Sequence, residues 1–92
     1  MDDDALESAL AAAFDGSPAE RRVVVRGARD LADSGKHLAD RGRPLTVEEV
    51  TENLGDAPDG TSLAGRWNWW MGALDVAYGG YEPFQVRRYH RE

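Results

Sequence analysis

The stretch Ser62–Tyr81, SLAGRWNWWMGALDVAYGGY, constrains the fold more than any other part of the chain, because it holds all three tryptophans. Ser62 can accept hydrogen bonds from the free N–H groups of a first helical turn. Gly79 and Gly80 can adopt the left-handed conformation that ends a helix. Pro83 follows shortly afterwards and cannot continue one. The stretch is therefore predicted to form a single helix.

Apolar residues cover more than half of the circumference of this predicted helix, at about 100° per residue. The predicted inward residues are Leu63, Trp67, Trp70, Met71, Ala73, Leu74, Ala77 and Tyr78. Such a helix belongs at the centre of a small core, so Trp67 and Trp70 are interpreted as core residues rather than as a stacking platform for sugars or bases. Trp69 and Val76 lie together at the edge of the apolar side. Exposed tryptophan is enriched at interface hot spots, which makes Trp69 the first interface candidate.

A narrow stripe of small and polar residues remains on the same helix, at spacings of three and four. It consists of Gly65, Asn68, Gly72, Asp75 and Gly79. The stripe could be a solvent-facing seam, or another element could approach it closely, since each glycine in a helix interior costs about 1 kcal/mol and needs compensation. The interface candidates are therefore Trp69, Val76, Gly65, Gly72, Asn68 and Asp75.

Three further helices are predicted before the central one. The first covers residues 1–15, of which 1–4 are expected to fray. The second begins after Ser17, which forms a capping box with Glu20, and it ends at Gly35. The third begins after Thr46 and ends at Gly55, with its glutamates facing outward.

Two segments need separate comment, one because it could be helix or strand and the other because it could extend the second helix. The run Val23–Val25 is β-branched and could form a strand, although the capping box before it favours a helix. Lys36–Arg41 is expected to add a turn, with Leu38 on the apolar seam of the second helix.

The C-terminal segment Pro83–Tyr89 alternates apolar and polar residues, which allows an extended segment or a short edge strand. Because no convincing partner strand is visible, it is expected to lie extended over the helices, with residues 90–92 frayed. The predicted fold is an all-α single domain over residues 1–92, a small bundle of about four helices with an extended C-terminal segment.

Composition sets the expected environment. The chain has a net charge of −6, with ten arginines against a single lysine, no isoleucine and no cysteine. The absence of cysteine rules out disulfides and thiol chemistry. Neither an apolar run of about 18 residues nor a signal-peptide pattern is visible, so a cytoplasmic protein without a membrane role is expected.

Two segments, RRVVVRGARDLADSG and RWNWWMGALDVAYGGYEPFQVRR, resemble a small haloarchaeal protein family of unknown function. The resemblance implies a protein that works in molar salt, and it implies no activity. The acidic composition is also consistent with molar salt, because the Debye length at 1 M salt is about 3 Å and the self-repulsion of a net negative charge then costs little.

Charge is also blocked along the chain. Residues 1–20 and 47–65 contain acidic but no basic residues, whereas 21–46 contain seven basic and three acidic residues. Acidic and basic elements are expected to face one another within the fold or across a dimer. A basic patch for a polyanion is the alternative, and its contacts would be Arg66, Arg87, Arg88 and Arg91.

No constellation of residues defines a catalytic, cofactor or metal site. Asp33, His37 and Asp40 could share a helix face, but this is interpreted as solvated surface because a metal needs three or four converging donors. Ser34, His37 and Asp40 cannot form a nucleophilic triad, since side chains spaced along one helix point side by side. The protein is expected to be no enzyme and to need no cofactor.

Three functions from different classes remain. The main hypothesis is a protein–protein interaction or assembly module, a homodimer or a complex with another protein. The alternative is a helix-turn-helix or winged-helix nucleic-acid binder, in which the helix after residue 61 would enter the groove. A small-molecule binder or enzyme would use a pocket near Trp69, Asn68 and Asp75.

Overall fold

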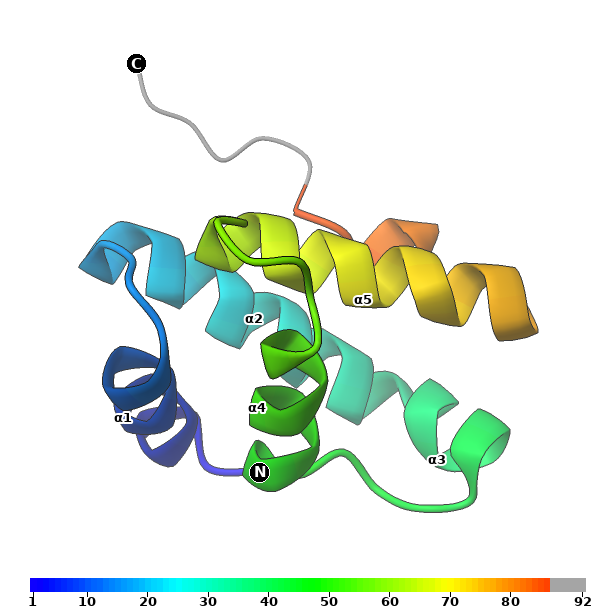
Figure 1. Cartoon of the computed structure of the whole chain (residues 1–92). Helices are drawn as coiled ribbons and strands as arrows, with labels where there is room; N and C mark the ends of the chain where they lie inside the picture. Colours follow the sequence, from blue (N-terminus) through cyan, green and yellow to red (C-terminus); the bar gives the residue numbers. More distant parts are fainter. Residues whose placement is uncertain (87–92) are drawn as a thin grey trace.

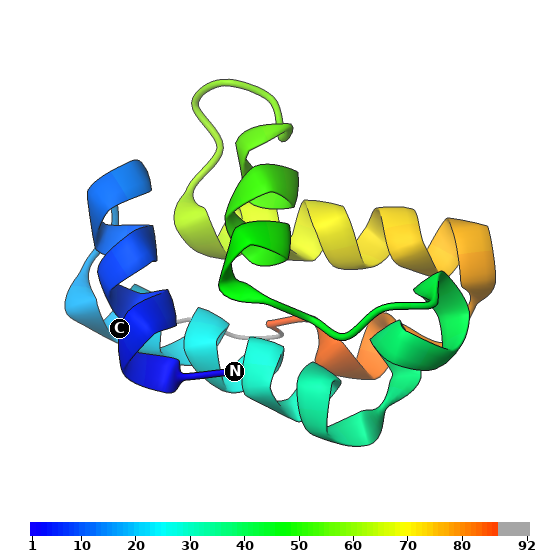
Figure 2. The same cartoon turned by 90° about the horizontal axis from the view of Figure 1, so that it is seen from below.

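The computed structural model describes residues 1–86. Within this range the chain forms five α-helices, one 3-10 turn and no strand, which confirms the predicted all-α class. The elements are α1 (Asp3–Ala13), α2 (Pro18–Ser34), α3 (Lys36–Arg41), α4 (Val47–Gly55), α5 (Leu63–Tyr78) and the 3-10 turn η1 (Glu82–Phe84). Helix α5 lies along one side of the molecule and packs on α2 and α4 (Figure 1). Seen from below, α1 and α3 lie at opposite ends of α2 (Figure 2).

The predicted helix starts are confirmed. Three residues act as N-caps, and each side-chain oxygen accepts from the N–H three positions later at 3.0–3.1 Å: Ser17, Thr46 and Ser62. Helix α1 begins at Asp3, inside the stretch expected to fray, because the Asp2 carboxylate accepts from the N–H of Asp4 at 3.0 Å. The open question over Val23–Val25 is also resolved, since the run lies inside α2.

The segment after α2 departs from the prediction. Gly35 adopts a left-handed conformation (φ 75°) that separates α2 from a distinct short helix α3. This turn resets the helical phase, so Leu38 leaves the apolar seam and is 51% exposed. His37 takes the inward position and is fully buried. The interpretation of His37 as solvated surface was therefore wrong.

The core confirms the inward position of two tryptophans. Trp67 is fully buried and Trp70 is 3% exposed, and their rings meet edge to face with centroids 5.6 Å apart. The predicted inward face was too wide, however, because Ala73, Ala77 and Tyr78 are exposed. Helices α2 and α4 cover one side of α5 only, and the other helices of residues 1–86 are too few to surround it.

Helices α2 and α5 approach each other closely at Gly27. A Cβ atom at this position would lie 3.1 Å from Nε1 of Trp67 and 3.3 Å from its Cε2. This separation is tighter than ordinary van der Waals contact, so an alanine at position 27 would require the buried indole to shift by a few tenths of an ångström.

After α5 the chain folds back, and residues 82–84 pack over α2 and α5. Gly79 and Gly80 have positive φ angles of 81° and 84°, which turn the chain at the end of α5. Tyr81 is then fully buried, and Phe84 and Val86 pack against the core. The described residues of the predicted C-terminal segment do lie over the helices, but the prediction of extended structure was wrong for Pro83 and Phe84, which belong to η1. The predictions for Arg87, Arg88, Arg91 and the frayed end fall on residues 87–92, outside the described part of the chain.

Opposite charges meet within the fold, as one interpretation of the charge blocks expected. Arg29 of α2 pairs with Asp3 of α1 at 3.1 Å, and Arg21 approaches Glu7 at 3.6 Å. Arg41 and Arg43, which precede α4 in the sequence, likewise form ion pairs with the carboxylate of Glu49. The acidic first block thus faces the basic second block across the α1–α2 contact.

Candidate functional site

The polar residues of the stripe on α5 hold the returning residues 81–86 of the chain. The amide of Asn68 holds the backbone of Val86 at both ends, since its Nδ2 donates to the carbonyl at 2.9 Å and its Oδ1 accepts from the N–H at 2.7 Å. Nε1 of Trp67 donates to the carbonyl of Phe84 at 2.8 Å. The polar residues of the stripe are therefore engaged, but no other described element approaches its glycines closely: a Cβ at Gly72 would meet only Gln85, at 4.0 Å, and one at Gly79 would meet nothing within 4 Å.

The other stripe residues are also engaged within the chain. Asp75 accepts from the backbone N–H of Tyr81 at 2.9 Å. A Cβ at Gly72 would lie 4.0 Å from the side-chain amide of Gln85. Gly65 lies beside Thr61, in the loop that leads into α5. The predicted small-molecule pocket near Trp69 thus loses two of its polar groups, because Asn68 and Asp75 already bind backbone.

The remaining two interface candidates lie on the side of α5 that faces solvent. Trp69 is 39% exposed and Val76 is 90% exposed. Two exposed alanines at helical spacing complete this surface, which we name the outer face of α5: Trp69, Ala73, Val76 and Ala77. None of its side chains is charged, although charged residues make up 30% of the chain.

Arg66, the candidate polyanion contact on α5, turns away from the outer face. Its guanidinium donates to the carbonyl of Leu54 at 3.0 Å and lies 5.1 Å above the ring of Phe14. It therefore joins α5 to the end of α4 and to the residue that follows α1. The other three candidates, Arg87, Arg88 and Arg91, lie beyond the described residues.

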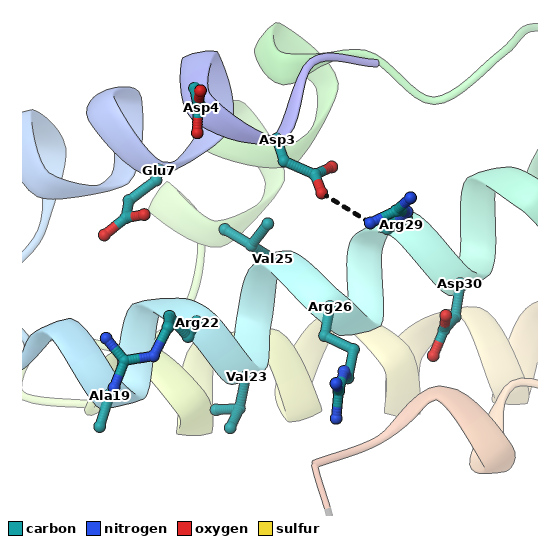
Figure 3. A pocket seen from close by; sticks show the side chains of 10 residues that line it. All are labelled: Asp3, Asp4, Glu7, Ala19, Arg22, Val23, Val25, Arg26, Arg29 and Asp30. Atoms are coloured by element: carbon teal, nitrogen blue, oxygen red, sulfur yellow. Dashed lines mark hydrogen bonds and ion pairs between the residues drawn. The ribbon is translucent and has the colours of Figure 1, made fainter.

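A second candidate is an open groove of about 670 Å³ between α1 and α2 (Figure 3). Its lining carries carboxylates mostly from α1 and guanidinium groups only from α2: Asp3, Asp4, Glu7, Arg22, Arg26, Arg29 and Asp30. Arg29 reaches across it to Asp3, and Val25 lies between the two walls. Because acidic and basic groups nearly balance, the groove does not favour an anionic or a cationic ligand.

A third candidate is the buried polar cluster around Glu49. Arg43 donates two hydrogen bonds to its carboxylate, both at 3.1 Å, and Arg41 approaches at 3.4 Å. The hydrogen bonds from Arg43 are the largest cause that lowers the pKa of Glu49, and nearby positive charge adds to it. Glu49 was predicted to face outward, but its side chain is only 12% exposed.

His37 belongs to the same cluster. Its Nδ1 lies 2.8 Å from the carbonyl of Arg43, and since a carbonyl only accepts, the proton sits on Nδ1. The ring meets Trp70 edge to face at 6.2 Å, and Nε2 lies 3.7 Å from Glu49 without a hydrogen bond. Residues 1–86 contain no group of three metal-ligating side chains. His37 on α3, Glu49 on α4 and Trp70 on α5 meet at this cluster.

Tyr81 takes part in a smaller polar cluster with two residues of α3, Lys36 and Asp40. Its hydroxyl donates to Asp40 at 2.8 Å, and Lys36 pairs with the same carboxylate at 3.0 Å. Hydrogen bonds from Lys36 and then Tyr81 lower the pKa of Asp40, whereas burial and the same carboxylate raise the pKa of Tyr81. The contact fixes the returning C-terminal segment to α3.

Sequence reasoning missed Glu20, His37, Glu49 and Tyr81. Glu20 was recognised only as half of a local capping box, but its carboxylate also accepts from the N–H of Ala64, on α5, at 2.8 Å. In the sequence, the presence of a glutamate at position 20 is the only feature that could have indicated its hydrogen bond to α5. His37 and Tyr81 had no signal, because each depends on a glycine turn that changes the direction of the chain.

These contacts define the class of the protein. It is a small all-α protein whose described polar clusters serve the fold and whose central helix exposes an uncharged apolar face. Within residues 1–86, no helix combines the length and the apolar character that crossing a membrane requires.

The chain belongs to the WNWW domain family, whose model matches residues 1–75. The four letters correspond to Trp67, Asn68, Trp69 and Trp70 in this chain. No curated protein and no solved structure matches it.

Proposed function

We propose that this protein is a protein–protein interaction module that docks through the outer face of α5. The observation that carries the proposal is the exposure of Trp69 and Val76 on a helix face without charge. Exposed tryptophan flanked by small apolar residues is typical of interface hot spots. Arg66, Asn68 and Asp75 of α5 are already bound within the chain.

The proposed setting is a salt-rich cytoplasm, in line with the haloarchaeal resemblance. At 1 M salt the Debye length is about 3 Å, so surface charges select partners poorly. Salts that are excluded from the protein surface strengthen apolar contacts. An uncharged face on a protein of net charge −6 is then the surface best suited to specific docking.

The alternative, nucleic-acid binding through α4 and α5, has weaker support. A recognition helix needs free polar side chains near its start. Arg66 is held by Leu54 and Phe14, and Asn68 is held by Val86. Acidic residues also occupy the first turn of α4, which would lie close to phosphates.

A photo-crosslinking amino acid at position 76 tests the proposal. We expect it to give a discrete covalent adduct in cells that express the full chain, and we expect Trp69→Ala in the same chain to abolish that adduct. The matched control carries the crosslinker at Leu38, an exposed apolar residue on α3 that is 51% exposed. If position 76 gives no adduct, or both positions give the same adduct, the outer face is not a docking surface.

A further inference from the structure

We propose that Trp67 and Asn68 form a binding site for the main chain of an extended peptide, and that residues 84–86 of this chain occupy the site as a displaceable strap. We name the two groups that make the contact, Nε1 of Trp67 and the side-chain amide of Asn68, the main-chain clamp. The clamp includes no residue of the outer face of α5, so this inference stands apart from the proposed function.

The clamp binds three backbone groups of the strap. Nε1 of Trp67 donates to the carbonyl of Phe84 at 2.8 Å. The Asn68 amide donates to the carbonyl of Val86 at 2.9 Å and accepts from the N–H of the same residue at 2.7 Å. Gln85, between them, is extended, with φ −70° and ψ 148°. Helix α5 thus holds the strap as the edge of a sheet holds an added strand, through main-chain hydrogen bonds.

Recognition of the main chain makes the site tolerant of sequence. These three hydrogen bonds involve no side chain of the strap, so any residue with a backbone N–H and C=O can supply them. The amide of Asn68 suits this task because it carries a donor and an acceptor on one group. Phe84 and Val86 add apolar contacts with the core. The ligand class is therefore an extended segment with apolar side chains two positions apart.

The burial pattern allows the strap to open without unfolding the core. None of residues 82–86 is buried, whereas Tyr81 before them is fully buried. Tyr81 is anchored separately, since its N–H donates to Asp75 and its hydroxyl donates to Asp40. Release of residues 82–86 therefore leaves Tyr81 in place. Segments with few buried contacts open locally at a lower free energy than global unfolding.

The strap also leaves part of its groove empty. A cleft of about 190 Å³ lies between residues 83–86 and α2, where Val23, Arg26, Gly27 and Asp30 line it. A partner segment with larger side chains than the strap would have room there.

The family match separates the site from its occupant. The matched residues 1–75 include Trp67 and Asn68, two of the four residues that correspond to the family's letters. The match ends before the strap. The clamp thus lies in the matched domain, whereas the segment that fills it lies beyond the match, as expected for a site that can take a segment from another source.

Hydrogen exchange of the Trp67 indole N–H, followed by NMR on the full chain, measures how often the strap opens. Two variants break the same contact from opposite sides. Val86→Pro removes the N–H that Asn68 accepts and leaves the clamp intact, whereas Asn68→Asp removes the donor of the clamp. Loss of one hydrogen bond should raise the exchange rate about 2- to 10-fold in both. The control Val86→Thr keeps the N–H and the side-chain shape, and it should stay near wild type.

An added peptide separates docking from a purely structural role. The probe is a pentapeptide with the sequence of residues 82–86 and blocked ends, used at millimolar concentration because a tethered segment has an effective concentration of that order. In Val86→Pro the probe should restore slow exchange, because the clamp is intact and free to bind it. In Asn68→Asp the probe should have no effect. A control peptide that is N-methylated at its last residue lacks only that N–H and should restore neither variant.

Each outcome supports or overturns the inference. Restoration by the probe in Val86→Pro and not in Asn68→Asp supports it. The inference is overturned by a wild-type indole that exchanges only through global unfolding, by variants that leave the exchange rate unchanged, or by a probe without effect on Val86→Pro. Equal protection by the two peptides overturns main-chain recognition. If circular dichroism shows that Asn68→Asp does not fold, the two peptides on Val86→Pro decide the question alone.

Discussion

Replacing Glu20 should loosen the start of α5 although Glu20 lies in α2. Its side chain is buried, and its Oε2 accepts from the N–H of Ala64 at 2.8 Å. Ala64 is in the first turn of α5, where backbone N–H groups have no partner within the helix. In the same turn the hydroxyl of Ser62 accepts from the N–H of Gly65. The first turn of α5 is therefore capped by one side chain next to the helix and by one side chain from α2.

The magnitude follows from this contact. A hydrogen bond to a charged group contributes about 1.5–3 kcal/mol, so Glu20→Ala should lower the free energy of unfolding by about 2–3 kcal/mol. In a domain of this size each kcal/mol shifts the Tm by about 4–8 °C, which predicts a loss of about 10–20 °C. Glu20→Gln keeps an acceptor oxygen and loses the charge at the helix N-terminus, so it should cost about 1 kcal/mol.

Unfolding in urea, followed by tryptophan fluorescence, measures both variants, since Trp67 and Trp70 are buried and report on the core. The matched control is Glu52→Ala, an exposed glutamate of α4, which should change the free energy by less than about 0.5 kcal/mol. If Glu20→Ala is no worse than this control, or if Glu20→Gln is as damaging as Glu20→Ala, the buried contact to α5 does not stabilise the fold as argued.

Two further substitutions test the packing and the charge network. Alanine in place of glycine in a helix usually stabilises by about 1 kcal/mol, but Gly27→Ala should not, because its Cβ would press on the buried Trp67. The control Gly55→Ala has open space around the new Cβ and should raise the free energy of unfolding. Equal unfolding free energies for the two variants would contradict the close approach of α2 and α5. The lowered pKa of Glu49, caused first by the Arg43 hydrogen bonds, means that its contribution to stability is present above the ordinary carboxyl pKa and is lost as pH falls through the lowered value. Denaturation midpoints measured from neutral to acid pH should therefore fall less steeply for Glu49→Gln than for wild type, and parallel curves would show that this ion pair does not link pH to stability.

Local rules predicted the starts of the helices well. An N-cap depends on a side chain and an N–H only three residues later, so Ser17, Thr46 and Ser62 could be assigned from the sequence. The capping box also favoured helix for the valine run, where β-branched composition alone pointed to a strand. The burial of Trp67 and Trp70 followed from helical spacing in the same way.

Periodicity failed where a glycine turn separated two segments. Helical spacing counts positions on one continuous axis, and the left-handed Gly35 starts a new axis for α3. Leu38 was placed by counting across that turn, and His37 was buried instead. The width of the apolar side of α5 failed for a related reason, because the sequence states how apolar a helix is and not how many neighbours cover it.

The partners of polar side chains were the least predictable part of the candidate site. Asn68 looked like a surface residue of the glycine stripe, yet it binds the backbone of Val86. Backbone groups are the same in every residue, so no residue type marks such a partner. Long-range contacts of this kind appear only once the chain is folded.

The four residues that correspond to the family's letters divide into two roles. Trp67 and Trp70 fill the core, and Asn68 with Nε1 of Trp67 holds the returning segment. Trp69 makes no hydrogen bond or ring contact with any residue in the range 1–86. Tryptophan is a poorer helix former than alanine, so the helix itself gains nothing from it. Its position on an uncharged face of an acidic chain is the feature on which the proposed docking depends, which is why the outer face of α5 is the part to test first.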